Sequence, residues 1–597
     1  MIGLRPLAVY GGPNPFAVDP VLLVEMVVKQ EDQQNLLEAM ANLQVSSADW
    51  YRASPSDLNQ PLAQQLGWFL ADWSLQALNF VRGYLHASGC ATEPRKGHVL
   101  IWLGFHDPQL SLSALGLAAK WLGALAQAQT ASGLKAELDQ LWLGCRNRHP
   151  DYQAQIVMQA ARFSGVPYAP AWDMARHWRY GQGARSRVLF ESSSCADGYF
   201  GARISGSKAM TKTVLQSLGL RTPAFRLVAN EYELDAAVAE LGFPCVTKPI
   251  DSGGGKGVSA GLRDMGAVRQ GFASARAYSA GPILVETHAP GEDHRLLVVE
   301  GRLVAAIRRE PPSVTGDGEQ TIGALVAAKN KGRDARSLWR SGFMRPILLD
   351  ASALVHLAGL GLSAASVLAE GQTVRVRSNA NLSTGGDCMD VTEQVHPHIR
   401  VQVESLAKTL NMPMLGADYL TTDIGSSPLS VGGQFIEINT TPGLDALVAA
   451  GWSLERAGAL ALGELPGRIP INLLVLPDDA LAQALVTARG VPWPQGSGWA
   501  SLEQASLAGV DLLINTKKPW AGVQVLLGHR SLTQAVVIAS ESQIRRHGLP
   551  LEAFQVAHVF CDLPPVWMGV LRRHCNTVQV ETMAPDNSVL VNALTGV

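Results

Sequence analysis

Residues 246–260 read VTKPIDSGGGKGVSA and place two lysines, Lys248 and Lys256, around three consecutive glycines. An apolar run precedes the glycines and a second apparent strand follows them, so the pattern predicts a glycine-rich turn between two antiparallel strands. A Walker A loop would need G-x-x-x-x-G-K-[ST] at the start of a helix, whereas here Gly257 follows Lys256. Glycines let successive N–H groups converge on phosphate oxygens, and Lys248 adds a point charge. The stretch indicates a phosphate-binding hairpin, although a plain flexible hairpin tip has the same composition.

Two further strand-like segments carry candidate metal ligands. GGQFIEINTTPG places Glu437 and Asn439 two positions apart, so both side chains project from one face of a strand. LGADYLTTD places Asp418 on another apolar strand just before it. Two carboxylates and an amide oxygen are hard ligands of the kind that Mg²⁺ takes when it also contacts nucleotide phosphates. The alternative is an ordinary half-exposed strand with solvated acidic residues.

Composition limits the function classes. The 597 residues contain 49 basic and 51 acidic side chains, a formal net charge of −2, without the basic surplus of a protein that binds a nucleic-acid backbone. The N-terminus lacks a signal-peptide pattern, and no apolar stretch is long enough to span a membrane. Seven scattered cysteines form no C-x-x-C pair, so neither a disulfide framework nor a zinc knuckle is indicated. We expect a cytoplasmic protein without nucleic-acid or membrane partners.

The pattern along the chain indicates three domains. Residues 1–165 mix strand-like runs such as VLLVEMVV with Ala/Leu/Gln-rich helices such as LSALGLAAKWLGALAQAQ. Residues 166–463 continue with short strands and helices, including a hairpin predicted around Glu300-Gly301. Near residue 464, the Gly- and Pro-containing stretch GELPGRIP indicates a domain boundary before a last α/β segment, 464–597.

The motifs between residues 200 and 450 resemble, in the same order, those of the ATP-grasp superfamily and, within it, the cyanophycin synthetase family. The resemblance is carried by GEDHRLLVVEGRLVAAIRR, VTGDGEQTI, SNANLSTGG, VTEQVHP, GADYLTTDI and EINTTPG, with GGPN near the N-terminus. It implies an α/β (α+β) fold with an ATP-grasp core, an N-terminal α/β domain and a C-terminal Mur-ligase-like segment. It also implies ATP and Mg²⁺ as cofactors and an ADP-forming ligase that activates a carboxylate for attack by an amine. In such a protein VTEQVHP begins a helix, which disfavours a metal site at His396 and His398.

The same resemblance assigns expected roles to individual residues. The phosphates and the nucleotide would be held by Lys212, Lys248, Ser252, Gly253, Gly254, Gly255, Lys256 and Gly257, the adenine by Glu286, Thr287 and His288, and the ribose by Asp293. The magnesium ligands would be Asp418, Glu437 and Asn439; the candidate catalytic residues are Arg295, Arg309 and Ser383; and the substrate loop would use Asn381, Ser383, Thr384, Gly385 and Gly386. The arginines would stabilise the transferred phosphoryl group or the carboxylate that receives it. The loop would grip a chain-terminal carboxylate.

Two departures from the family narrow the function. Some cyanophycin synthetases carry H-x-x-E-H in an N-terminal helix, but the matching helix here, GWFLADWSLQAL, has Trp68, Ala71 and Asp72 at those positions. We therefore expect no metallopeptidase. In the last segment, LPDDAL at 476–481 replaces the glycine-rich phosphate loop of the Mur-ligase-like module, and Ile538 stands where a magnesium-binding glutamate is expected. This segment is predicted to be degenerate, with a structural or oligomer-contact role.

Three hypotheses follow from these features. The first is a ligase with one ATP site that extends a polyamide by joining preformed β-Asp-Arg dipeptides, as the shortened cyanophycin synthetases do. The second is an ATP-grasp ligase of another specificity, and the third is a non-catalytic scaffold that binds ATP or polymer. The expected partners are a small dipeptide, a polyamide chain and further copies of the chain in a homo-oligomer. The sequence leaves the monomer unit, the primer requirement and the oligomeric state undetermined.

Overall fold

The computed structural model describes residues 2–54, 59–92, 98–172, 174, 176–250, 255–333, 345–487, 494–516 and 518–581. The chain forms two compact units, one made of Met1–Val188 with Leu462–Val597 and the other of Leu189–Ala461. The segments predicted as the first and last domains therefore share one unit. In the described ranges, no helix is both long and apolar enough to cross a membrane.

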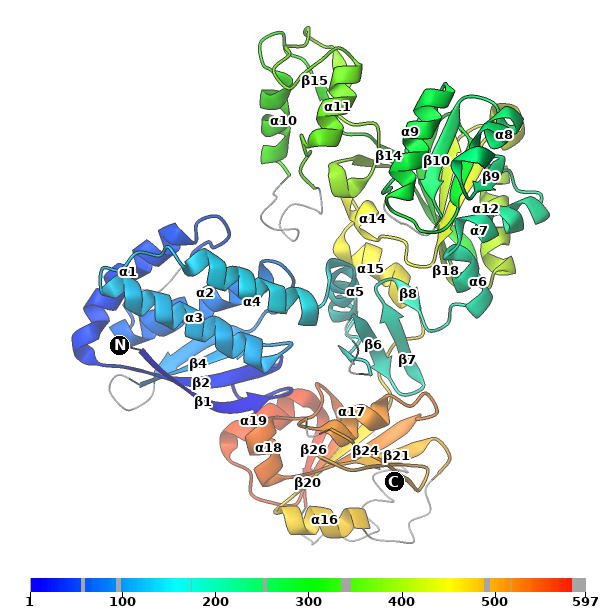
Figure 1. The fold of residues 1–597 in the computed structure, drawn as a ribbon. Helices are drawn as coiled ribbons and strands as arrows, with labels where there is room; N and C mark the ends of the chain where they lie inside the picture. Colours follow the sequence, from blue (N-terminus) through cyan, green and yellow to red (C-terminus); the bar gives the residue numbers. More distant parts are fainter. Residues whose placement is uncertain are drawn as a thin grey trace. The chain divides into compact units, whose positions relative to one another are not determined.

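The N-terminal half of the first unit is an antiparallel sheet of order β1-β2-β4-β3 with its helices on one face (Figure 1). The predicted strand VLLVEMVV is β2, and its alternate residues enter two different cores. Leu22, Val24 and Met26 face the helices, whereas Val21 and Leu23 pack with residues from the C-terminal segment. This alternation explains why the two ends of the chain share one unit. The elements are β1 (Ile2–Tyr10), β2 (Val21–Val28), η1 (Gln30–Asp32), α1 (Gln33–Ser46), α2 (Leu62–Asn79), β3 (Ser88–Thr92), β4 (His98–Gly104), α3 (Pro108–Ala126), α4 (Leu134–Arg148) and α5 (Tyr152–Phe163).

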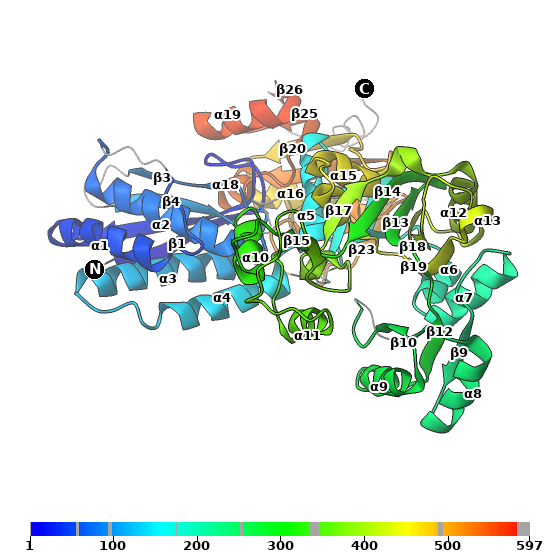
Figure 2. The same ribbon diagram turned by 90° about the horizontal axis from the view of Figure 1, so that it is seen from above.

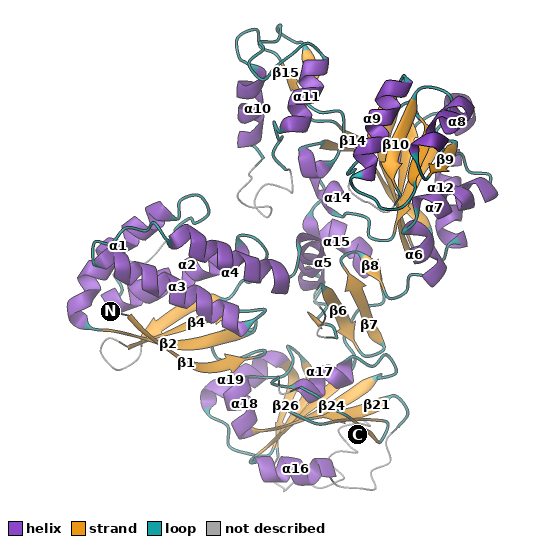
Figure 3. Cartoon of the chain, viewed as in Figure 1, coloured by secondary structure: helices purple, strands orange, loops and turns teal. Residues whose placement is uncertain are grey.

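The C-terminal half of the first unit is a seven-stranded sheet of order β23-β22-β21-β24-β20-β25-β26. Five neighbouring strands, from β21 to β26, are parallel, and helices cover both faces (Figure 3). Leu474 and Leu476 of β20 pack under α16, whereas Leu473 and Val475 enter the opposite core. A strand that is buried on both faces needs such a continuous apolar run. The elements are β20 (Ile471–Leu476), α16 (Asp479–Thr487), β21 (Ser497–Ala500), β22 (Ala505–Leu507), β23 (Val510–Leu512), α17 (Ala521–Leu527), β24 (Gln534–Ser540), α18 (Glu541–His547), β25 (Phe554–Val559), α19 (Pro565–His574) and β26 (Cys575–Val580).

A short sheet of order β5-β6-β7-β8 and two helices lead into the second unit. These elements are β5 (Tyr168–Pro170), β6 (His177–Gln182), β7 (Arg185–Phe190), β8 (Ser193–Ser194), α6 (Tyr199–Ser205) and α7 (Lys208–Ser217).

The smaller sheet of the second unit has the order β11-β10-β12-β9 and is covered by α8 and α9 (Figure 2). The glycine-rich stretch joins β10 to β11, and these strands are antiparallel, as the sequence predicts. The elements are β9 (Phe225–Val228), α8 (Glu231–Leu241), β10 (Cys245–Pro249), β11 (Ser259–Leu262), α9 (Met265–Arg276) and β12 (Ile283–Thr287).

The larger sheet of the second unit has the order β17-β14-β13-β18-β19, with every neighbouring pair antiparallel. The hairpin predicted at Glu300-Gly301 is confirmed, since it joins β13 to β14 and both residues have positive φ. One face of this sheet packs on α12 through apolar residues such as Leu296 and Ala417. The other face carries charged side chains. The elements are β13 (Glu292–Val299), β14 (Arg302–Glu310), β17 (Asp387–Asp390), η3 (Thr392–Gln394), α12 (Pro397–Thr409), β18 (Met414–Thr421), α13 (Pro428–Val431), β19 (Gln434–Asn439), α14 (Asp445–Ala449) and α15 (Leu454–Leu462).

Between β14 and β17 the chain makes a small subdomain with its own apolar core, which includes Val314, Ile322, Ile347 and Leu357. Its sheet has only two strands, so the packing of two helices stabilises it. The elements are β15 (Ser313–Thr315), α10 (Ile322–Lys331), α11 (Ala351–Gly359), β16 (Thr373–Arg375) and η2 (Leu382–Thr384).

Candidate active site

Two predicted phosphate-binding lysines lie on either side of one buried carboxylate. Nζ of Lys212, from α7, lies 2.6 Å from Oε2 of Glu286, and Nζ of Lys248, from β10, lies 2.5 Å from Oε1. Glu286 is on β12, directly paired with β10. Burial lowers the pKa of Lys212 to about 8, although the Glu286 charge opposes this shift. Burial also opposes ionisation of Glu286, but the two lysines outweigh it and hold its pKa below the usual value.

The hairpin between β10 and β11 is described from Gly255 onward, and the predicted residues Ser252, Gly253 and Gly254 lie outside the described residues. Gly255 and Gly257 have φ of 74° and 69°, a conformation that favours glycine. A Cβ on Gly257 would lie 2.9 Å from the side chains of Pro249 and Tyr278. The turn therefore needs glycine for both conformation and space, while Lys256 is exposed at its tip.

The charged face of the larger sheet aligns residues from three strands in one row. Arg295 of β13 pairs in register with Asp418 of β18, which pairs with Glu437 of β19. Nε of Arg295 lies 2.7 Å from Oδ1 of Asp418. Burial disfavours the Asp418 charge, but Arg295 and Arg309 outweigh it and keep its pKa below the ordinary value. Burial, and then the neighbouring Asp418 charge, raise the pKa of Glu437.

Arg309, the second predicted arginine, connects this row to the predicted ribose ligand. Its Nη2 donates to Oδ1 of Asp293 at 2.6 Å and lies 3.2 Å from Oδ2 of Asp418. Asp293 and Arg309 are direct partners across β13 and β14. The structure therefore brings Asp293, Arg295, Arg309 and Asp418 together as one ionic cluster, with its arginines and carboxylates paired.

The set Asp418, Glu437 and Asn439 has the donor types for magnesium. Asn439 lies on the same face of β19 as Glu437, and it is in register with Gly416, two residues before Asp418. Its Nδ2 is buried and finds no hydrogen-bond partner within the described part of the chain, and the atom that would bind magnesium is the amide oxygen, Oδ1. No group of three or more His, Cys, Asp or Glu side chains that could hold a metal occurs among the described residues. The present set contains only two such side chains, because its third member is an amide. The residues fit a magnesium ion that also takes oxygens from phosphates.

The two sheets approach one another at this point. The charges of Lys208 and Lys248 act on the pKa of Glu437, and the charge of Glu437 acts on that of Lys212. The helix α7, which carries Lys208 and Lys212, also packs against β19, which carries Glu437, so these lysines lie close to the predicted metal ligands.

The predicted substrate loop, 379–386, forms a closed turn. The N–H groups of Thr384 and Gly386 donate to the carbonyl of Asn381 at 3.0 and 3.1 Å, and Oγ1 of Thr384 donates to Oδ1 of Asn379 at 2.9 Å. Gly385 has a φ of 95°. A Cβ on Gly255 would lie 2.9 Å from Nδ2 of Asn381, so the glycine hairpin touches this loop. For Ser383, the structure describes only the backbone, inside η2.

The remaining predicted nucleotide residues lie at the end of β12. Their backbone N–H groups anchor the connection to β13, since Thr287 donates to Ala224 and His288 to Pro244, each at 2.9 Å. Thr287 is half-buried and His288 is exposed. Contact with adenine stays a prediction for both residues and for Glu286.

Sequence reasoning missed two residues of the lysine cluster. Oγ1 of Thr222 accepts a hydrogen bond from Nζ of Lys212 at 3.0 Å. Lys208 begins α7, one turn before Lys212, and its charge reaches Glu437. The spacing of Lys208 and Lys212 in KAMTK, four residues apart on one helix face, was a usable signal.

Other sequence predictions fall outside this cluster. Trp68, Ala71 and Asp72 lie on α2, where Asp72 accepts from the Tyr51 hydroxyl at 2.9 Å. VTEQVHP does begin a helix, because Nδ1 of His396 accepts from the N–H of His398 at the start of α12.

Comparison with known proteins gives matches for the central region. A family model described as "ATP-grasp domain" matches residues 213–299. Cyanophycin synthetase from Geminocystis herdmanii is 32% identical over 299 residues, which cover 49% of this chain and 34% of that protein. The glutathione biosynthesis bifunctional protein of Desulfotalea psychrophila is 28% identical over 331 residues, covering 53% and 41%. The crystal structure of a bifunctional glutathione synthetase from Pasteurella multocida matches with a TM-score of 0.38 at 22% identity, covering 56% of this chain and 49% of that one.

In each of these cases the match spans less than half of the relative's own length. The expected mixed α/β architecture with an ATP-grasp domain is confirmed, while the shortened type of synthetase is not distinguished. The chain contains an ATP-grasp domain and, over about half of its length, is similar to cyanophycin synthetases.

Proposed function

We propose that this chain is an ADP-forming ligase that uses ATP to join the terminal carboxylate of a polyamide to the α-amine of a dipeptide. The observation that carries the proposal is that α7, whose Lys212 meets Lys248 at Glu286, packs against β19, whose Glu437 is in one row with Asp418 and Arg295. One side of this site is suited to the phosphates of a nucleotide. The other side is suited to magnesium and to the charge that develops during phosphoryl transfer.

In the first step, an oxygen of the terminal carboxylate attacks the γ-phosphorus of ATP, giving an acyl phosphate and ADP. Lys212 and Lys248 would exchange their contact with Glu286 for the phosphates. Asp418, Glu437 and Asn439 would hold magnesium, which would supply neutralisation of charge on the phosphate oxygens. Once these charged groups contact the phosphates, the fold would hold them where they stabilise the charge of the transition state.

In the second step, the neutral α-amine attacks the acyl carbon, the acyl C–O bond breaks, and inorganic phosphate leaves while the amine proton passes to the phosphate or to solvent. Arg295 and Arg309 form ion pairs with Asp418, a proposed metal ligand, and a guanidinium there could hold a carboxylate or phosphoryl oxygen in a two-pronged hydrogen bond. The loop 379–386 would orient the acceptor, with its shape fixed by the hydrogen bonds of its own turn. Positioning of the two reactants supplies most of the rate in such a reaction.

The proposed amine is a preformed β-Asp-Arg dipeptide. A branched polyamide with an amide on each aspartate side chain needs two carboxylate activations per repeat. Among the described residues we identify one lysine cluster suited to phosphates beside residues suited to magnesium. At the end of β20 it has Asp478 and Asp479 in place of a phosphate loop. Units whose branch amide already exists need only the first activation.

The test is to incubate the purified protein with ATP, Mg²⁺, a short polyamide primer and either β-Asp-Arg or free aspartate plus arginine. We expect one ADP per dipeptide and a growing polymer with the dipeptide, and none with the free amino acids. Polymer from the free amino acids would contradict the proposal. Light scattering on the same sample tests the expected homo-oligomer.

A second candidate is an ATP-grasp ligase for another amine, favoured by the 28% identity to a glutathione biosynthesis bifunctional protein over 53% of the chain. Turnover with a single amino acid but not with the dipeptide would select it. Binding of ATP without ADP formation, with any acceptor, would instead select the scaffold.

A further inference from the structure

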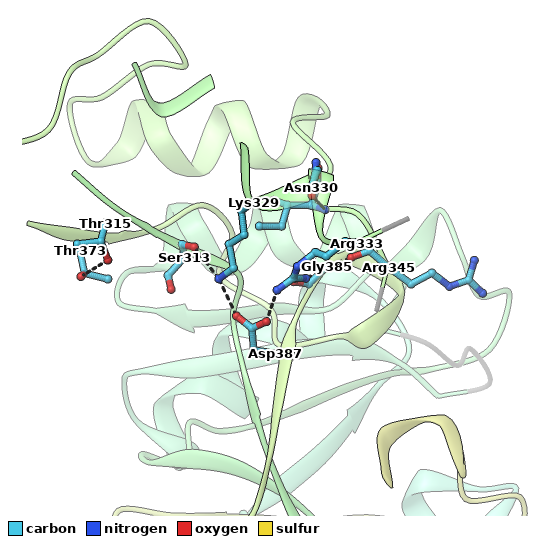
Figure 4. A network of polar contacts seen from close by, with 10 residues as sticks. Ser313, Thr315, Lys329, Asn330, Arg333, Arg345, Thr373, Gly385 and Asp387 are labelled. Carbon is cyan, nitrogen blue, oxygen red and sulfur yellow. Dashed lines mark hydrogen bonds and ion pairs between the residues drawn. The ribbon is translucent and has the colours of Figure 1, made fainter. Parts of the chain in front are cut away.

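The substrate loop is attached to the small subdomain by a buried arginine that sequence reasoning did not identify. Arg333 follows α10 by two residues and is 4% exposed. Its Nη1 donates to the carbonyl of Gly385 at 2.5 Å, and its Nη2 forms an ion pair with Oδ1 of Asp387. Figure 4 shows the guanidinium and Lys329 converging on this carboxylate. Gly385 belongs to the loop, and Asp387 is the first residue of β17.

Both oxygens of Asp387 are used. Lys329 of α10 places Nζ 2.9 Å from Oδ2 and also donates to the carbonyl of Ser313 at 3.1 Å. The same helix end reaches the segment under the loop, because Asn330 bonds both the N–H and the carbonyl of Ile347, at 2.8 and 3.0 Å. A Cβ on Gly385 would lie 2.6 Å from Cα of Ile347, so loop and segment are in close contact. Residues at the end of α10 therefore bind both Asp387, at the end of the loop, and Ile347, which contacts the loop.

The position of this attachment matters because Asp387 begins β17, which pairs with the part of β14 that carries the proposed catalytic residue Arg309. In the β14–β17 register, Asp387 is opposite Glu310, and Cys388 is opposite Arg309. The loop therefore joins β17 one residue before Cys388, the residue that is paired with Arg309. The hydrogen bonds of the loop itself, among Asn379, Asn381 and Thr384, close the turn but do not orient it on the sheet.

We infer that Arg333 is a positioning residue which, through Gly385 and Asp387, fixes the loop 379–386 over Arg309 so that it can receive the carboxylate substrate. This inference rests on the proposed function for the identity of the substrate. Because a guanidinium presents several donors in a fixed plane, it can hold the carbonyl and the carboxylate at the same time, whereas a lysine holds them less rigidly. The direct contacts of Arg333 include neither the lysine cluster nor the proposed metal ligands, so we expect its loss to affect the carboxylate substrate more than ATP.

The variants are Arg333→Met, Arg333→Lys and Asp387→Asn, with Lys331→Met as the control. Lys331 is an exposed cation of the same helix, so its substitution changes the charge of α10 without touching the loop. In ligation assays, Arg333→Met should raise the KM for the carboxylate substrate about tenfold and leave the KM for ATP within about twofold. Arg333→Lys should recover part of this loss, and the control should match the parent chain.

Hydrogen–deuterium exchange provides a readout that needs no turnover. The amides of Thr384, Gly385 and Gly386 are hydrogen-bonded within the loop, and their exchange should accelerate in Arg333→Met and Asp387→Asn but not in Lys331→Met. Unchanged loop exchange in both variants, or an equal rise in the two KM values, would overturn the inference. If the parent chain ligates nothing, the proposed function fails, while the exchange experiment still decides whether Arg333 positions the loop. Asp387→Asn, which keeps the size of the side chain, covers the case in which Arg333→Met does not fold.

Discussion

The β18–β19 pair carries the proposed metal ligands Asp418, Glu437 and Asn439, and the helix with Lys212 packs against it. The end of β20, in a second α/β sheet, carries Asp478 and Asp479 instead. There, Asp479 accepts hydrogen bonds from Ser540 and from Ser542, the latter at 3.0 Å. Carboxylates at this edge repel phosphate. Both sheets are nevertheless well packed, each between apolar layers or under a helix. Core residues maintain the fold of a sheet, whereas the residues in the loops at its edge determine its chemistry. The fold alone therefore does not indicate the function.

The strongest test of this contrast is Glu437→Gln. Glutamine keeps the shape but is a poorer metal ligand, so ADP formation should fall about a thousandfold. Because the pKa of Glu437 is raised by burial and by Asp418, loss of its charge should not unfold the protein, and circular dichroism melting checks this. Asp479→Asn at the other sheet is the matched control and should leave the rate within about twofold. Equal losses of ADP formation in the two variants would mean that the two sheets do not differ in their role in the reaction.

Lys248→Met compared with Lys256→Met separates the buried and the exposed lysine of the hairpin. Lys248 is 5% exposed and contacts Glu286, whereas Lys256 is exposed. A charge acts more strongly in a site that excludes water, so we expect kcat/KM for ATP to fall about a hundredfold in the first variant and about fivefold in the second. Steady-state kinetics with varied ATP measure both values. The reverse ranking would mean that the hairpin tip, rather than the strand, carries the phosphate contact.

ATP affinity should depend on pH through Lys212. The pKa of this lysine is lowered to about 8, and bound phosphate favours its protonated form. The affinity for ATP is therefore highest well below pH 8, where Lys212 is protonated in the free protein. Above pH 8 it falls by up to about tenfold per pH unit, until the pH reaches the higher pKa of Lys212 in the ATP complex. Calorimetric titrations between pH 7 and 9.5 measure the slope. Lys212→Met binds more weakly at every pH and should lose the slope; a slope that persists in this variant would assign the titration to another group.

Ser540→Ala should give the smallest change in activity. Ser540 caps α18 with a capping box and donates to Asp479, so its loss should cost about 1–2 kcal/mol of unfolding free energy. Ligation should stay within about twofold of the parent value. Urea unfolding followed in parallel with ADP release separates the two effects, and lost activity at unchanged stability would show that this edge takes part in the reaction.

Local patterns along the chain predicted many of the elements and several site residues. The alternation in FIEIN and the glycines after TKPI indicated β19 and the β10–β11 turn, because side-chain period and backbone freedom are local properties. Register was not predictable in this way. The direct pairing of Arg295 with Asp418 depends on how two distant strands align, and neither strand specifies this alone.

The sequence by itself determined the residue types available for phosphate and metal, the glycines of the hairpin and the absence of a phosphate loop after β20. Only the tertiary structure decided that Glu286 lies between two lysines, that the ends of the chain share one unit, and that Arg333 holds the loop at Gly385 and Asp387. The physical reason is that a buried charge is stable only beside a partner, and the fold decides which residue becomes that partner. The distance between two residues along the chain does not indicate whether they pair. Arg333 and Asp387 are 54 residues apart and meet at one ion pair.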